Sequence, residues 1–406
     1  MRSKIVFSII FLILIFSWMG TTFVGLFENM PETNPSDSFL SKVHAATKFI
    51  KIGADGYSKT QNPCYYSGIR AKKICDKYML GFNLTVSLLG TKTDLERRDE
   101  LVVLHKNGEL DYLYEDVDIS EQLQTFVDFG LEMKQDGRNF VLLQPPCKYG
   151  EMSEVYKGFY RNCATKKSEE VADTVRSYGL DVISIAEIIE AENMDKDTVF
   201  FKTDHHWLPQ TGLWACKYLG RYLNENCGYT VDNSIFDESN YDIWYETWLG
   251  SQGQKVTEIY CDPEPIAIMI PTYNTDLDVY YQHRDKTEET LSGTISDTLF
   301  DWKRLEPDDI LKFGPYAFYG YGDQPLIQIH NKLKQDGKRM LIIKESFADV
   351  MNPYLSNAAE YVDVIDVRHY EGSLHEFIAE TNPDTVVVIY SAGGFYPSSM
   401  LSDHFE

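Results

Sequence analysis

The stretch Arg339-Met340-Leu341-Ile342-Ile343-Lys344-Glu345-Ser346 is the one from which the fold can be read. Its apolar run predicts a short strand that is buried on both faces. Similar runs follow at Val362–Val367 and Thr385–Tyr390, and a helix is expected between them at Leu374–Glu380. Apolar strands that alternate with helices indicate an α/β fold with a mostly parallel sheet covered on both sides.

The same alternation extends toward the N-terminus. Ser120 is expected to cap a helix that Gly137 ends, and Pro209 suits the first turn of another helix. Asn107-Gly108 predicts a hairpin turn between strands at 101–104 and 110–114. The other expected elements are strands at Phe140–Leu143 and Leu180–Ile185 and helices at Glu169–Ser177, Ala186–Ala191, Leu326–Lys334 and from Ser346 through Leu355.

Residues 230–320 interrupt this rhythm, because they are rich in Tyr, Asp, Gly and Thr. Ile266–Ile270 and Val279–Tyr281 are expected as strands between turns. We interpret the segment as an insertion of hairpins and long loops. It would shape a substrate groove or serve only as structural ornament.

The N-terminus carries a separate signal. Residues 5–27 hold no charge and follow Arg2 and Lys4. A helix of that length spans a hydrocarbon core of about 30 Å, and flanking basic residues stay in the cytoplasm. We therefore expect a membrane anchor within residues 1–30, a polar linker at 31–48 and a catalytic domain at 49–406 on the extracellular face. A cleaved signal peptide, which would leave the protein secreted, is the alternative.

Composition restricts the partners. The formal net charge of −24 disfavours nucleic acid, whose phosphates require a positive surface. The 27 Tyr and 22 Phe residues fit a surface that stacks on sugars, or simply a Tyr-rich globular domain. Seven cysteines fit an oxidising compartment. Neighbours in sequence that could pair are Cys64/Cys75, Cys147/Cys163 and Cys216/Cys227, which leaves Cys261 over.

The chemistry is expected at Thr203-Asp204-His205-His206-Trp207 together with Ser346. If the first segment is extended, Asp204 and His206 point to one face and His205 points to the other. A carboxylate beside an imidazole fixes its tautomer, which makes His206 a general base, and Ser346 at a strand end is the candidate nucleophile. The alternatives are structural: serine also caps helices, and buried histidines also pair with carboxylates.

A metal site is the competing interpretation of Asp-His-His, because manganese phosphoesterases carry a DHH motif. Those enzymes need further aspartate clusters on early strands, whereas the candidates here, Asp363 and Asp366, come late in a strand. We therefore expect no metal and no cofactor.

The motifs resemble a known family. Lys202–Trp207 with Gly212 resembles the signature of the DHHW proteins of Gram-positive bacteria, in the alginate O-acetyltransferase (AlgX/AlgJ-like) branch of the SGNH hydrolase superfamily. Leu341–Ala348 resembles the nucleophile segment of that family, with Glu345 in place of the usual Asp. Segments at 144–148 and 364–370 are also similar, so the resemblance covers roughly residues 95–400.

The resemblance implies an SGNH-like α/β/α sandwich in permuted order, with the Asp/His pair preceding the serine. It assigns Asp204 as orienter, His206 as base and Ser346 as nucleophile. The Glu345 departure makes the geometry of an oxyanion site there less defined. Residues carried as substrate or oxyanion candidates without an assigned step are His205, Trp207, Lys148, Asn352, Arg368, Ser391 and Gly393.

The implied function is extracellular transfer of an acetyl group, through an acetyl-serine, onto hydroxyls of a surface or secreted polysaccharide. A membrane-bound O-acyltransferase is the implied supplier of the acetyl group. A polysaccharide acetyl esterase with the same triad is one alternative. A non-catalytic carbohydrate-binding scaffold is the other.

Overall fold

The computed structural model describes residues 102–104, 109–112, 116–148, 164–195, 198–256, 261–306, 314–397 and 405. The expected anchor, the linker, the Asn107-Gly108 turn, Cys64, Cys75 and Cys163 lie outside these residues. Within them, no helix has the length and apolar character that a membrane crossing requires.

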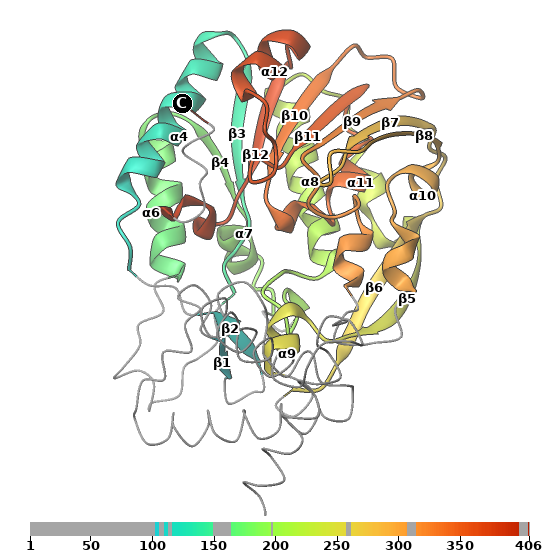
Figure 1. Ribbon diagram of the computed structural model, residues 1–406. Coiled ribbons are helices and arrows are strands. Elements are labelled where there is room, and N and C mark those ends of the chain that lie inside the picture. Colours follow the sequence, from blue (N-terminus) through green and yellow to red (C-terminus); the bar gives the residue numbers. More distant parts are fainter. Residues whose placement is uncertain are drawn as a thin grey trace, which may run out of the picture. The chain divides into compact units, whose positions relative to one another are not determined.

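An eight-stranded sheet forms the centre of the fold (Figure 1), in the order β4-β3-β12-β10-β11-β9-β7-β8. The first five strands pair in parallel, and β9, β7 and β8 continue the sheet in antiparallel fashion. The predicted mostly parallel sheet is therefore confirmed for the half that carries Ser346. Its strands are β3 (Asn139–Gln144), β4 (Asp181–Ser184), β7 (Leu277–Gln282), β8 (Glu288–Gly293), β9 (Leu326–Asn331), β10 (Arg339–Lys344), β11 (Tyr361–Ile365) and β12 (Thr385–Ile389).

Helices cover both faces of this sheet, as expected for an α/β/α sandwich. Alternate residues of β10 enter different cores: Leu341 and Ile343 pack with α4, α6 and α12, whereas Met340 and Ile342 pack with α7, α8 and α11. The helices are α4 (Ser120–Gln135), α6 (Ala164–Ser177), α7 (Ile185–Ala191), α8 (Pro209–Asn226), α9 (Ser251–Val256), α10 (Ile295–Thr298), α11 (Asn352–Leu355) and α12 (Leu374–Thr381).

The expected helix at Leu326–Lys334 is wrong, since this segment is strand β9. Its buried residues Leu326, Ile327, Ile329 and Asn331 fit a strand between two neighbours better than a helical stripe. The expected helix from Ser346 through Leu355 is also corrected. It is broken into a 3-10 turn, η7 (Ser346–Ala348), and the short α11.

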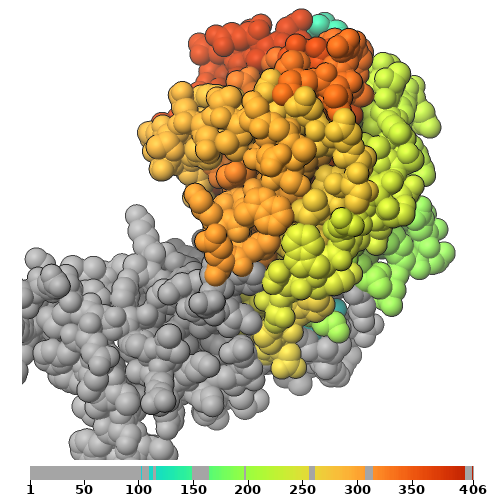
Figure 2. Space-filling model, turned by 90° about the vertical axis from the view of Figure 1, so that its right-hand side faces the viewer, coloured from blue at the N-terminus to red at the C-terminus, as the bar shows by residue number. Residues whose placement is uncertain are grey.

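The segment 230–320 divides between two places. The strands β5 (Tyr241–Trp248) and β6 (Glu264–Pro271) form a separate antiparallel ribbon, as do β1 (Val102–Leu104) and β2 (Leu110–Tyr112), so both predicted hairpin regions pair. The strands β7 and β8 instead extend the main sheet. Figure 2 shows that this segment, in yellow and orange, builds a large part of one face of the molecule. Short 3-10 turns complete it: η3 (Asn233–Phe236), η4 (Glu238–Asn240), η5 (Trp302–Leu305) and η6 (Pro315–Phe318).

The possible disulfide between Cys216 and Cys227 is wrong, because both thiols are free and buried. Cys216 lies inside α8 and Cys227 follows its last residue. A helical rise of about 1.5 Å per residue separates them by about 16 Å, far beyond the reach of a disulfide. Cys147 and Cys261 are also free and buried.

Candidate active site

A tight bend presents the Asp-His motif. Phe200 and Trp207 form an antiparallel bridge, and the backbone N–H of Phe201 donates to the carbonyl of His206. The side chain of Asp204 then accepts from the N–H of His206 at 2.9 Å, as in an Asx-turn. The expectation of an extended segment is therefore wrong. Asp204 and His206 meet because the carboxylate caps the bend, and His205 is not turned away from them.

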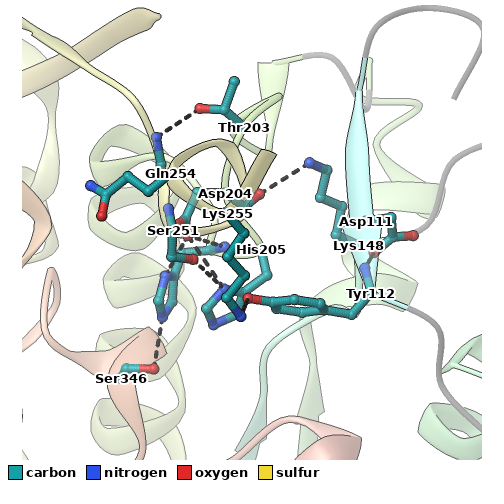
Figure 3. A network of polar contacts seen from close by, with 12 residues as sticks. Asp111, Tyr112, Lys148, Thr203, Asp204, His205, Ser251, Gln254, Lys255 and Ser346 are labelled. Atoms are coloured by element: carbon teal, nitrogen blue, oxygen red, sulfur yellow. Dashed lines mark hydrogen bonds and ion pairs between the residues drawn. The ribbon is translucent and has the colours of Figure 1, made fainter. Parts of the chain in front are cut away.

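A chain of hydrogen bonds joins Asp204, His206 and Ser346 (Figure 3). Asp204 Oδ1 lies 2.6 Å from His206 Nδ1, and His206 Nε2 lies 2.7 Å from Ser346 Oγ. An ionised carboxylate only accepts, so the proton of this imidazole sits on Nδ1 and the lone pair of Nε2 faces the serine hydroxyl. The three residues lie at 204, 206 and 346 in sequence, and the fold brings them into one line.

Aromatic rings fix the plane of the His206 imidazole. His205 packs on one side with ring centroids 3.8 Å apart, and Tyr316 stacks at 4.3 Å with an interplanar angle of 19°. Phe347 adds an edge contact at 5.1 Å. Burial and the neighbouring His206 lower the pKa of His205 to about 3, so this second ring is neutral at physiological pH. His205 therefore packs against the imidazole of His206 and helps to fix its position.

Backbone amides hold the Asp204 carboxylate as an anion. Its Oδ2 accepts from the N–H of Ser251, the first residue of α9, at 2.6 Å. Burial raises the pKa of Asp204, but the histidines and these hydrogen bonds outweigh it and lower the pKa well below its usual range. Gly250 permits this approach, because a Cβ there would lie 2.5 Å from the Thr203 carbonyl oxygen.

Two charged side chains clamp the backbone of the motif. The buried Lys148 donates from Nζ to the carbonyl of Asp204 at 3.0 Å (Figure 3). It also donates to the carbonyl of Lys202 at 3.0 Å. Glu264 accepts from the N–H groups of Lys202 and Thr203 at 2.7 and 2.6 Å. Lys148 was a substrate candidate in the sequence analysis. In the structure its ammonium group donates hydrogen bonds to the backbone of the Asp-His bend and stabilises that bend.

Trp207 ties the two halves of the site together. The indole is fully buried, and its Nε1–H donates to the carbonyl of Phe347 at 2.9 Å. Phe347 directly follows the serine, so this bond fixes the turn η7 against the Asp-His bend. Trp207 is placed for positioning rather than for contact with a substrate.

Glu345 links the serine strand to its neighbour. Its Oε1 accepts from the N–H of Ser391 at 2.6 Å, just after β12. Burial raises the pKa of Glu345, partly offset by this hydrogen bond. Ser391 is the N-cap residue of the turn η8 (Ala392–Phe395), and Gly393 lies inside this turn. Glu345 thus ties the end of β10 to the residues that follow β12.

Arg368, itself exposed, belongs to an ion cluster that reaches into the core. It pairs with Asp366 at 2.6 Å and with Asp323 at 2.7 Å. Lys344, fully buried, pairs with the same two aspartates and with Asp349 at 2.5 Å. Burial alone lowers the pKa of Lys344, but the three carboxylates outweigh it and raise the pKa. Arg368 is therefore engaged within the protein and not held out toward a substrate.

Asn352, at the start of α11, is fully buried, and neither its amide nitrogen nor its amide oxygen has a hydrogen-bond partner among the described residues. Gly320 lies against it, since a Cβ at that position would be 3.7 Å from Asn352 Nδ2. Gly320, Tyr321 and Gly322 all have positive φ. Left-handed backbone favours glycine, which has no side chain. At Gly320 it therefore lets the backbone lie close to the Asn352 amide.

Two groups in the described part of the chain have side chains close enough to share a metal: Asp204, His205 and His206, and Asp323, Asp366 and His369. In the first, both carboxylate oxygens already accept hydrogen bonds from protein N–H groups. In the second, Asp366 is already engaged by Arg368 and Lys344. These donor sets fit hydrogen-bonded networks better than a metal centre.

Residues that the sequence interpretation missed are Gly250, Ser251, Glu264 and Tyr316. Only Gly250-Ser251 gave a usable signal, since a Gly-Ser pair after a strand is a common helix start. Tyr316 and Glu264 reach the motif from distant sequence. No local pattern marks them.

The chain is similar to acetyltransferases of the SGNH type. Residues 105–232 match the family model of an SGNH hydrolase-like domain, acetyltransferase AlgX. No curated protein sequence matches the chain. The resemblance inferred from the DHHW motif is confirmed by the family match.

Solved structures share the fold. PatB1 from Bacillus cereus has a TM-score of 0.59 at 18% identity, over 76% of this chain and 99% of that one. The same protein with a sulfonyl adduct has a TM-score of 0.60 at 17% identity, over 75% and 98%. A DHHW family protein from Eubacterium siraeum has a TM-score of 0.56 at 18% identity, over 75% and 98%.

Proposed function

We propose that this protein is an extracellular O-acetyltransferase that acetylates hydroxyl groups of a surface or secreted polysaccharide. The observation that carries the proposal is the hydrogen-bonded line Asp204–His206–Ser346, with contacts of 2.6 and 2.7 Å. Such a line activates a serine for acyl transfer. The match to an acetyltransferase domain favours acetyl as the acyl group.

The reaction would proceed in two halves. Ser346 Oγ attacks the carbonyl carbon of an acetyl donor, and its proton passes to His206 Nε2. The donor group leaves with that proton, and an acetyl-serine remains. A sugar hydroxyl then attacks the acetyl-serine while His206 takes its proton, the acetyl group moves to the sugar, and the proton returns to Ser346 Oγ.

The developing negative charge needs donors near Ser346. The backbone N–H groups of Ser346 and Phe347 donate to no acceptor within the described residues, and they open the turn η7. They are our candidates for the oxyanion site, because unsatisfied amides at a helical start can face an oxyanion. Asp204 stabilises the imidazolium that forms at His206.

We further propose that residues 5–27 anchor the protein, that the catalytic domain faces outward, and that a membrane-bound O-acyltransferase supplies the acetyl group. The uncharged N-terminal segment after two basic residues supports the anchor and its orientation. Removal of the segment should release the protein from the membrane fraction.

The test is acetyl transfer by the full-length protein in detergent, with an acetyl-ester reporter and with or without an oligosaccharide. Acetylated sugar supports the transferase. Acetate released only to water supports the alternative, an esterase with the same triad. If no turnover depends on Ser346, both enzyme functions fail and a carbohydrate-binding scaffold is left. A serine-reactive sulfonyl reagent should label Ser346, and mass spectrometry of the labelled peptide checks this directly.

A further inference from the structure

We infer that Trp244 and Trp302 form a stacking platform for a neutral glycan chain, outside the triad itself. The inference rests on the proposed function, since the glycan would be the acetyl acceptor. Among the described residues, Trp244 and Trp302 are two of the few large apolar side chains that are exposed, at 37% and 44%. Both lie in the segment that builds the face seen in Figure 2.

The two indoles lie nearly parallel, with centroids 6.3 Å apart and an interplanar angle of 16°. The rings are stacked, so each covers part of one face of the other, and a ligand would pack on the parts of the two rings that stay exposed. Trp244 comes from the ribbon strand β5 and Trp302 from the turn η5, so distant parts of segment 230–320 combine to make it.

Internal contacts hold both rings in place. Trp244 Nε1–H donates to Glu246 at 3.1 Å, and Trp302 Nε1–H donates to the Ser296 carbonyl at 2.9 Å. The buried Phe318 packs edge-on against Trp302 at 5.2 Å. Because each indole donor is engaged and each ring is packed, binding on the exposed parts of the rings costs little side-chain entropy.

Buried aromatic rings connect the platform to the candidate active site through the interior of the protein. Trp244, Glu246 and Trp248 alternate along one face of β5. Trp248 stacks near Tyr316 at 6.2 Å, and Tyr316 stacks on His206 at 4.3 Å. Tyr316 and Phe318 share the turn η6, so this turn contacts both the catalytic candidate and the platform. At about 3.3 Å per residue, Trp244 lies about 13 Å along the strand from Trp248.

These features select the ligand. The C–H groups on the faces of a sugar ring carry partial positive charge and pack on the negative faces of aromatic rings. A second protein is disfavoured, since a stable interface buries about 800 Å² on each partner and two indoles supply far less. Anionic polymers are disfavoured by the formal charge of −24. A neutral glycan fits all of these features.

The test measures binding separately from turnover. Full-length Ser346→Ala protein is titrated with neutral cello- and chito-oligosaccharides, with binding followed by tryptophan fluorescence and by calorimetry. Adding Trp244→Ala or Trp302→Ala should weaken binding about tenfold each, from the loss of one stacking contact. Trp244→Phe and Trp302→Phe should restore part of the affinity. In the Ser346-containing protein, Trp244→Ala should raise KM for long acceptors more than it lowers kcat.

Tyr245→Ala is the matched control. Tyr245 is 59% exposed and neighbours Trp244, but its position in the strand places it on the opposite face. Its removal should leave binding unchanged. Equal affinity in the folded Trp244→Ala and Trp302→Ala proteins, no binding of either neutral glycan, or tighter binding of oligogalacturonate would overturn the inference. Loss of turnover with binding intact would instead contradict only the proposed acetyl transfer.

Discussion

Two lines of charged and polar groups meet at the end of β10, and they differ in how they end. The ion cluster of Lys344, Arg368, Asp323, Asp349 and Asp366 closes on itself, since every one of these groups pairs with another. The candidate catalytic line runs from Asp204 through His206 and stops at Ser346, which is only partly buried. A closed network fixes the backbone, whereas an open one leaves a hydroxyl available for reaction.

The comparison explains the alternation of roles in Lys344-Glu345-Ser346. Lys344 lies in the closed cluster, Glu345 ties β10 to the residues after β12, and Ser346 faces the imidazole. Three consecutive residues thus serve three different environments. The contacts of Lys344 and Glu345 hold the backbone that presents Ser346 to His206.

The largest expected effect is on the open line. Ser346→Ala should lower kcat/KM for an acetyl-ester reporter by at least about 10³-fold, because no other group supplies the nucleophile. The melting temperature should remain close to that of the wild type. Ser292→Ala, which removes an exposed hydroxyl on β8 bonded to Asp278, is the control and should keep full activity. Full activity of Ser346→Ala would show that the Asp204–His206–Ser346 line does not supply the nucleophile.

Opening the closed cluster should affect stability. Lys344→Met removes the fully buried cation from the buried Asp349 and Asp366 and from the partly exposed Asp323, and it should cost about 3–5 kcal/mol in the free energy of unfolding. Urea unfolding measures this cost. Lys286→Met, which breaks a pair with Glu371 whose side chains are 70% and 75% exposed, should cost under about 1 kcal/mol. Equal effects of the two substitutions would show that the cluster is not structural.

A smaller effect on stability and activity is expected at Lys148, which holds the backbone of the Asp-His bend. Lys148→Met removes two hydrogen bonds to the Asp-His bend and should cost about 2 kcal/mol in stability. It should also lower kcat about tenfold, since the carboxylate becomes less well fixed. Lys148→Arg can restore one donor contact and should recover part of the activity. A loss of stability without any change in kcat would separate the clamp from catalysis.

The smallest effect concerns pH. The pKa of Asp204 is lowered in the folded protein, so its ionised form stabilises the fold above the unfolded pKa of about 3.9. That contribution is lost as the pH falls below this value. Asp204→Asn should therefore reduce the slope of unfolding free energy against pH between about pH 2 and 5. An unchanged slope would mean that the carboxylate is not stabilised by its amide and imidazole partners.

Much of the fold was predictable because apolar runs report burial directly. The strands β3, β10, β11 and β12 and the helices α4, α8 and α12 occur where the pattern predicted them. The segment β9 was mistaken for a helix, since a short apolar run carries little periodicity. The Asp-His bend was mistaken for extended chain because an Asx-turn leaves no periodic pattern.

The sequence predicted the three candidate reacting residues of the site. It did not predict which residues hold them in place. Asp204, His206 and Ser346 could be chosen by residue type and motif, and the structure brings them within hydrogen-bond distance. Lys148 and Arg368 could be chosen only as substrate candidates, from segments that resemble the family. Whether they face a substrate or the protein depends on neighbours far away in sequence, and both face the protein.

The sequence by itself determined where most of the parallel strands lie along the chain, the motif residues and the acidic character, because each follows from local composition or spacing. Tertiary structure alone decided that a bend rather than a strand joins Asp204 to His206. It also decided that Tyr316 stacks on that histidine and that Trp244 meets Trp302. These contacts join residues distant along the chain, and only the packing of the whole sheet and its ribbon fixes which of them meet.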